Sequence, residues 1–87
     1  RELSMKSGIY NSDHYYWDEM EREYTLEATW LYENNGNDEP SLWYLLEIEI
    51  VEQERGSPEI NVATGSDVWH HILRDPDESR MEQRYVH

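Results

Sequence analysis

Residues 23–32 alternate between polar and apolar side chains, and this period of two predicts a half-buried β-strand. The apolar positions are Tyr24, Leu26, Ala28, Trp30 and Tyr32. A second strand is predicted over residues 42–52. We expect the two strands to pair as a hairpin, because residues 33–41 between them are rich in Asn, Asp, Gly and Pro, which are typical of turns.

The second strand has one fully apolar face and one mixed face. The apolar face, which we expect in the core, consists of Leu42, Tyr44, Leu46, Ile48 and Ile50. The mixed face consists of Trp43, Leu45, Glu47, Glu49 and Val51. If the hairpin closes with Tyr32 opposite Leu42, Glu27 of the first strand lies opposite Glu47. The outward face of the hairpin then combines several carboxylates with an exposed tryptophan.

The segment after the hairpin is predicted to form a turn, a short strand and a helix. The turn covers residues 55–58 and the strand covers residues 59–64. The helix covers residues 67–74, because apolar residues recur there at helical spacing after a capping Ser66 or Asp67. A proline soon after this segment prevents the helix from continuing.

The two ends of the chain are less clearly patterned. Residues 11–22 fit either a short helix or an extended lead-in, and residues 75–87 fit either a frayed tail or a weak helix. Residues 1–4 fit either an artificial addition before a natural start at Met5 or the beginning of an excised domain. The whole pattern predicts one α+β domain over residues 1–87, a small antiparallel sheet of three to four strands packed against one short C-terminal helix.

The composition is strongly acidic but still allows a core. The chain of 87 residues has 20 Asp and Glu against 7 Lys and Arg, a formal net charge of −13. Such a charge is typical of disordered chains, but four Trp and seven Tyr supply large groups for a core, each able to bury about 150–250 Å². The absence of cysteine excludes disulfides and thiolate zinc sites and favours an intracellular protein. No apolar run approaches the ~20 residues of a membrane-spanning helix.

No residue pattern indicates catalysis, a metal or a cofactor. His70 and His71 are adjacent, so on a helix they point about 100° apart and do not form the i, i+4 pair of a metal site. Residues 33–41 carry many oxygen atoms around Gly36 but lack the spacing of a calcium-binding EF-hand loop. One lysine and six scattered arginines disfavour nucleic-acid binding. We therefore expect a non-enzymatic protein without cofactors.

The carboxylates of the predicted hairpin are the candidate functional feature. Glu47 and Glu49 lie on one face, about 6.7 Å apart along the strand. Like charges opposite each other destabilise a sheet, so this face is either a solvated surface that keeps the protein soluble or a binding site for a basic partner. The candidate partner-binding residues are Glu23, Glu27, Glu47, Glu49, Glu52, Glu54 and Trp43.

Regularly spaced carboxylates on a rigid sheet can stand in for the phosphates of a nucleic acid. In this respect the chain resembles, as a class, the DNA-mimic anti-restriction and anti-CRISPR proteins of phages and plasmids. The resemblance implies a small inhibitor, a viral protein in the host cytoplasm, that occupies the basic nucleic-acid-binding surface of its target. The net negative charge leads us to expect that the chain itself binds neither nucleic acid nor membranes.

A second resemblance covers residues 48–73. Ile48-Glu-Ile-Val-Glu-Gln53 is followed, after a turn and a short strand, by Ser66-Asp-Val-Trp69-His-His-Ile72-Leu73. This succession is similar to the FYRC half of the phenylalanine/tyrosine-rich modules of trithorax-type chromatin proteins. As the alternative to the inhibitor, this resemblance implies a nuclear α+β interaction module of a eukaryotic chromatin protein, without enzymatic activity.

Overall fold

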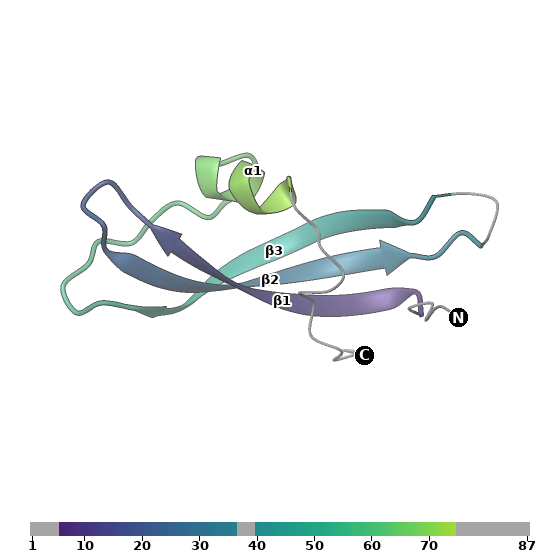
Figure 1. The fold of residues 1–87 in the computed structure, drawn as a ribbon, viewed down its shortest axis with the longest axis horizontal. Coiled ribbons are helices and arrows are strands. Elements are labelled where there is room, and N and C mark those ends of the chain that lie inside the picture. The colour runs from purple at the N-terminus through teal and green to yellow at the C-terminus, as the bar shows by residue number, and fades with distance from the viewer. Residues whose placement is uncertain (1–5, 37–39, 75–87) are drawn as a thin grey trace.

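The computed structural model describes residues 6–36 and 40–74 of the chain. They form a three-stranded antiparallel sheet in the order β1-β2-β3, with one helix on one of its faces (Figure 1). The elements are β1 (Gly8–Trp17), β2 (Glu23–Glu33), β3 (Leu42–Gln53) and α1 (Asp67–Leu73). This arrangement confirms the predicted α+β fold with a small antiparallel sheet and a short helix. The predictions for residues 1–4 and 75–87 lie outside the described residues.

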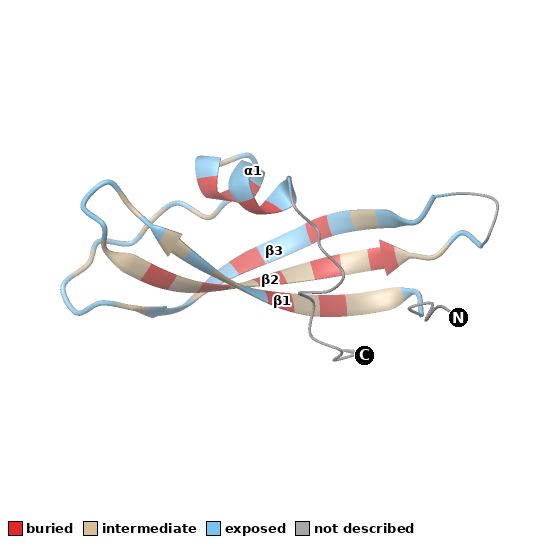
Figure 2. Ribbon diagram, in the orientation of Figure 1, coloured by how far each residue is buried: buried red, intermediate tan, exposed pale blue. Residues whose placement is uncertain are grey.

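The central strand β2 follows the predicted alternation along its whole length (Figure 2). Four of its side chains are fully buried on the face that carries α1, which we call the inner face: Tyr24, Leu26, Ala28 and Trp30. Helix α1 packs on this face through Val68, Trp69 and Ile72. The inner face is therefore the core, and full burial of each large apolar side chain contributes about 1.5–3 kcal/mol.

Helix α1 begins where the sequence predicts and ends one residue earlier, at Leu73, with Arg74 as its C-cap. Ser66 is its N-cap, and the Ser66 Oγ accepts a hydrogen bond from the backbone N–H of Trp69 at 3.2 Å. Asp67 in the first turn places a negative charge near the helix N-terminus, where the backbone dipoles favour it. A helix this short is held by its contact with the sheet rather than by its own length. Within the described residues, no helix is long and apolar enough to cross a membrane.

Strand β1 settles the ambiguity of residues 11–22 in favour of the extended alternative. Its ten residues pair with β2 in continuous register. Tyr10 and Ser12 are buried on the inner face. Tyr15 and Trp17, at odd positions, point to the opposite side of the sheet, because side chains of a strand alternate between its faces.

An extra residue in β3 reverses the side-chain alternation of this strand. Thr29 pairs with Glu47 but Trp30 pairs with Leu45, so Leu46 has no partner of its own and forms a β-bulge. On the N-terminal side of the bulge, Leu45 therefore points inward and is buried. On its C-terminal side, Ile48 and Ile50 point inward as the sequence predicts, until a second irregularity at Val51 shifts the alternation again and places Glu52 opposite Thr25.

Because of the bulge, the predicted assignment of side chains to the two faces is wrong for the first half of β3. Trp43 lies on the inner face, not beside the glutamates, and contacts three aromatic rings at centroid distances of 4.4 to 6.2 Å, those of Tyr10, Trp30 and Tyr32. Three side chains predicted to lie in the core are instead exposed by 41 to 48%: Leu42, Tyr44 and Leu46. The pattern could not distinguish the two faces, because residues 42–46 are all apolar.

The same bulge shifts the pairing of the carboxylates. Glu27 lies opposite Glu49, and not opposite Glu47 as a regular hairpin predicts. Glu47 lies opposite Thr29 instead. All three carboxylates stay on the side of the sheet that faces away from α1.

Residues 59–64 do not form the predicted short strand. The Asn61 Oδ1 accepts a hydrogen bond from the backbone N–H of Ala63 at 3.0 Å, and this local bond bends the chain away from a ladder. Ile60 and Val62 still pack against the core. The predicted apolar side of this segment is thus used for packing, without strand pairing.

Candidate protein-binding face of the sheet

The face opposite α1, which we call the outer face, is formed by alternate residues of β1 and β2 and by the residues of β3 that lie opposite them. Directly opposed residues of paired strands point to the same side, so the register fixes its rows. Along the sheet, the rows are Ile9/Leu31/Tyr44, Asn11/Thr29/Glu47, Asp13/Glu27/Glu49, Tyr15/Thr25/Glu52 and Trp17/Glu23. None of these residues belongs to the hydrophobic core cluster of the described chain. The outer face is apolar at one end, acidic in the middle, and both aromatic and acidic at the other end.

A row of three carboxylates crosses the middle of the outer face. Asp13 of β1 lies opposite Glu27 of β2, which in turn lies opposite Glu49 of β3. Neighbouring strands are about 4.8 Å apart, so the row destabilises the sheet by roughly 0.5 kcal/mol per like-charged pair. In the described part of the chain, no Lys or Arg forms an ion pair with Asp13, Glu47 or Glu49. The centre of the outer face thus gathers four carboxylates, those of Asp13, Glu27, Glu47 and Glu49.

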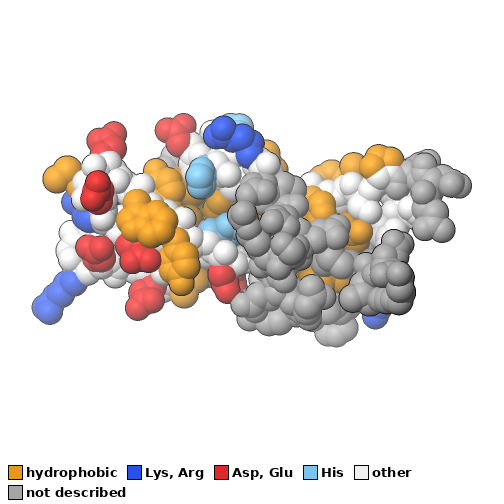
Figure 3. All heavy atoms as spheres, in the orientation of Figure 1, with side chains coloured by type: hydrophobic (Ala, Val, Ile, Leu, Met, Phe, Trp, Pro, Cys, Tyr) orange, Lys and Arg blue, Asp and Glu red, His pale blue; other side chains and the backbone are white. Residues whose placement is uncertain are grey.

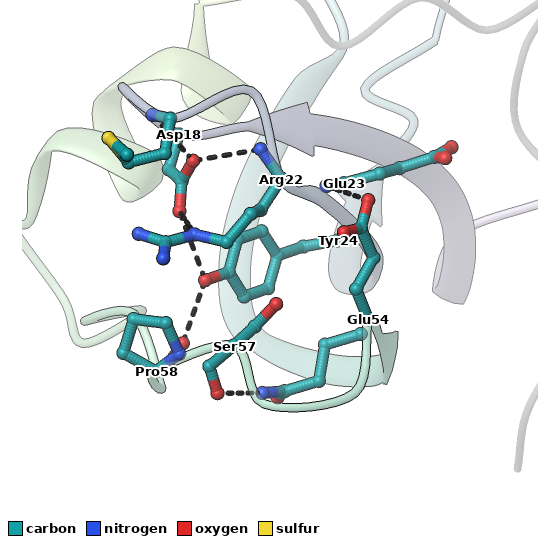
Figure 4. Close-up of polar contacts among 9 residues, drawn as sticks. Asp18, Arg22, Glu23, Tyr24, Glu54, Ser57 and Pro58 are labelled. Carbon is teal, nitrogen blue, oxygen red and sulfur yellow. Dashed lines mark hydrogen bonds and ion pairs between the residues drawn. The ribbon is translucent and has the colours of Figure 1, made fainter.

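A hollow of about 360 Å³ lies at the aromatic end of the outer face. Its lining consists of Tyr15, Glu23, Thr25, Glu52, Gln53 and Glu54. The backbone N–H of Glu23 donates a hydrogen bond to the Glu54 Oε2 at 3.1 Å, which joins the start of β2 to the residue after β3 (Figure 4). Three carboxylates therefore surround one open space, an arrangement that attracts cations.

Two aromatic side chains are exposed beside this hollow. Tyr15 and Trp17 are 60% and 55% exposed, with ring centroids 6.2 Å apart and ring planes inclined by 35°. Figure 3 shows acidic and hydrophobic side chains next to one another at the end of the molecule where the β1–β2 turn lies. Exposed Trp and Tyr often dominate the energy of protein–protein contacts. The sequence pattern does not identify this pair, because three contiguous aromatics show no alternation and only a strand places the first and third on one side.

A network of hydrogen bonds fixes the turn after β1 and the loop after β3 (Figure 4). The Asp18 Oδ1 accepts hydrogen bonds from the backbone N–H groups of Met20 and Arg22, both at 2.9 Å. The Asp18 Oδ2 accepts one from the Arg22 Nε at 2.7 Å. The Tyr24 hydroxyl donates to the Pro58 carbonyl oxygen at 2.7 Å and lies 3.2 Å from the Asp18 Oδ2. The network holds both segments at the aromatic end of the sheet.

The charges of this network follow from its contacts. Burial raises the pKa of the Asp18 carboxyl, but hydrogen bonds from the backbone and guanidinium of Arg22 outweigh it, so this pKa lies below its ordinary value of 3.8. The hydrogen bond to Asp18 raises the pKa of Arg22. Burial, and then the nearby Asp18 carboxylate, raise the pKa of Tyr24. At neutral pH the network therefore consists of an ion pair and a neutral hydroxyl.

A serine and a histidine lie within hydrogen-bond distance on the inner face. The Ser12 Oγ and the His14 Nε2 are 2.6 Å apart, and the Trp30 Nε1–H donates to the same Ser12 Oγ at 2.8 Å. Ser12 is only 1% exposed, so a substrate does not reach its hydroxyl. The serine instead satisfies the buried N–H of Trp30. Over the described ranges, no group of three or more His, Cys, Asp or Glu is placed to hold a metal ion.

The structure brings the predicted glutamates together in two groups. One group, at the centre of the outer face, contains Glu27, Glu47 and Glu49. The other group, around the hollow, contains Glu23, Glu52 and Glu54. Trp43, the remaining predicted residue, lies on the inner face. The structure adds Asp13 and Trp17, which lie on the outer face because residues 8–17 form a strand.

No protein-family model matches this chain, and no curated protein or solved structure is significantly similar to it. The similarity of residues 48–73 to an FYRC segment therefore stays a prediction. A strand, an irregular stretch and a helix do follow one another in this region. That succession is common to many α+β domains and does not distinguish the two hypotheses.

Proposed function

We propose that the chain is a non-enzymatic binding module whose outer face docks on a basic protein surface. The observation that carries this proposal is the row of Asp13, Glu27 and Glu49, which places like charges opposite one another across three strands. Their repulsion lowers the stability of the free protein. A cationic surface that covers the row neutralises the repulsion, so the row favours a basic partner.

The basic surface that best matches such an array is one that binds nucleic acid. Surfaces of this kind use Lys and Arg to contact closely spaced phosphates. Carboxylates held on a sheet replace the phosphates, and the field of a protein with a net charge of −13 accelerates association with a cationic target. The protein thus acts as an inhibitor that occupies the nucleic-acid-binding surface of its target.

The same charge disfavours the other occupants of the outer face. Nucleic acids and anionic membranes are repelled by it. A second copy of the chain brings another 13 negative charges to the contact. A basic protein is the occupant whose charge complements that of the outer face.

The test compares the protein with a charge-reversed variant, Glu27→Lys, Glu47→Lys and Glu49→Lys. Both proteins are immobilised, and proteins retained by the wild type alone are purified. Their binding to DNA or RNA is then measured while the free chain is added. We expect the chain to displace the nucleic acid, with an apparent affinity that falls as the salt concentration rises.

A matched control carries the same change of charge outside the outer face. It combines Glu19→Lys, Glu21→Lys and Glu59→Lys, three exposed positions. This control should retain the partner better than the outer-face variant does. Equal loss of binding in both variants, or a partner that binds nucleic acid undisturbed by the chain, contradicts the proposal and favours a merely solubilising role of the charge.

A further inference from the structure

The aromatic end of the outer face differs in chemistry from its acidic middle. The rings of Tyr15 and Trp17 are more than half exposed and lie 6.2 Å apart. Tyr15 also lines the hollow that Glu23, Glu52 and Glu54 surround. One aromatic ring and three carboxylates therefore border one open space of about 360 Å³, and the ring of Trp17 lies beside that of Tyr15.

A guanidinium group satisfies both kinds of side chain at once. It is planar and stacks on aromatic rings, and its five N–H donors match carboxylates in bidentate pairs. The ammonium group of lysine is compact and strongly hydrated, so it gains less from a ring and from a carboxylate pair. The chemistry of the hollow therefore favours arginine over lysine.

The structure also holds this end of the sheet in place before a partner arrives. The hydrogen bond from the Glu23 N–H orients the Glu54 carboxylate. The turn after β1 is fixed by Asp18, which engages the guanidinium of Arg22 at 2.7 Å. Groups that are already ordered lose less entropy on binding.

We infer that the hollow and the exposed rings of Tyr15 and Trp17 bind an arginine side chain of the basic partner. This inference rests on the proposed function and adds the residue type that the partner presents. Trp17 then takes the interface role that the sequence predicts for Trp43. The acidic row binds the partner through its charge, while the aromatic end selects for the shape of the cation.

Two synthetic peptides of equal length and charge test the inference, one alternating arginine with serine and the other lysine with serine. Calorimetric titration at low salt should show about three- to fivefold tighter binding of the arginine peptide, the ratio expected from one exposed cation–π contact. In the variant Tyr15→Ala, Trp17→Ala the two affinities should become equal. The control Tyr44→Ala removes an exposed ring from the opposite end of the same face and should keep the preference.

A second measurement uses the unmodified protein, so it does not depend on the folding of a variant. The indole N–H resonance of Trp17 should shift on addition of the arginine peptide, whereas that of Trp30, which donates to Ser12, should not. Equal affinity of the wild type for both peptides, or a preference that survives in the double variant, overturns the inference and leaves the proposed function intact. If neither peptide binds, both are contradicted.

Discussion

The side chains of β2 alternate between the two faces of the sheet, and the two faces differ in chemistry. The inner face is formed by side chains that are fully excluded from water, such as Trp30. The outer face carries Glu23 and Glu27, which face further carboxylates on β3 or in the hollow. One strand thus serves packing on one side and charge presentation on the other.

The residues that hold the fold and the residues that we propose for binding therefore lie on opposite sides of the sheet. The core between the sheet and α1 holds the fold, so the outer face is free to carry groups that repel one another. A substitution on one face changes side chains that do not directly contact those of the other face.

Removal of a core indole should destabilise the protein far more than removal of an exposed one. Trp30→Ala is expected to lower the free energy of unfolding by about 3–5 kcal/mol, because it leaves a cavity and removes the hydrogen bond from the indole to Ser12. Trp17→Ala, on the outer face, should cost less than about 1 kcal/mol. Urea unfolding of both variants measures the difference. Similar losses would show that the outer face also belongs to the core.

Two neighbouring residues of β3 test the bulge at Leu46. Trp43→Ala should cost about 2–4 kcal/mol, since this ring packs among three others on the inner face. Tyr44→Ala should change the stability by less than about 0.5 kcal/mol, because its ring is 43% exposed. The opposite order in thermal or urea unfolding would support the regular, unbulged register.

A smaller, pH-dependent effect is expected from Asp18. Its pKa is lowered by folding, so its contribution to stability is complete above the unfolded value of about 3.8 and is lost as the pH falls through the lower folded value. Asp18→Asn keeps the acceptor for the backbone of the turn but removes the charge beside Arg22. The variant should be less stable than the wild type at pH 7, and this gap should close below pH 3.8. A gap that is constant with pH excludes the ion pair as its cause.

The smallest effect concerns the acidic row itself. Glu49→Gln removes the repulsion with Glu27 and should raise the free energy of unfolding by roughly 0.5 kcal/mol. The same substitution should weaken binding of a basic partner. A gain in stability together with a loss of affinity is the signature of a site kept for function. Loss of stability would instead indicate that the row is supported by contacts that the charge pattern does not reveal.

The sequence predicted the elements whose patterns are unambiguous. The alternation of residues 23–32 and the cap at Ser66 identified β2 and α1 nearly to the residue. The pattern of residues 11–22, which include most of β1, is ambiguous, because its contiguous aromatics fit both a strand and a helix. The prediction of a strand at residues 59–64 is wrong. The Asn61 side chain accepts a hydrogen bond from the backbone N–H of Ala63, and this local bond takes the place of pairing with a neighbouring strand.

The sequence predicted the carboxylates of the candidate site, such as Glu47 and Glu49, but not its exposed aromatic residues, Tyr15 and Trp17. Glu47 and Glu49 lie beyond the bulge, where polar and apolar residues alternate, so their face could be assigned. Trp43 lies within an unbroken apolar run, and a single extra residue moved it into the core. Trp17 could be placed only once its strand was known. A bulge depends on how neighbouring strands pack against each other, and the local alternation of polar and apolar residues carries no information about this packing.

The salt dependence of binding between the arginine–serine peptide and the chain tests directly whether the outer face is the binding surface. We predict that the logarithm of the affinity falls linearly with the logarithm of salt concentration for the wild type. The slope should be clearly flatter for Glu27→Gln, Glu47→Gln, Glu49→Gln than for the control Glu19→Gln, Glu21→Gln, Glu59→Gln. Equal slopes in the two triple variants would contradict the claim that the outer face is the binding surface.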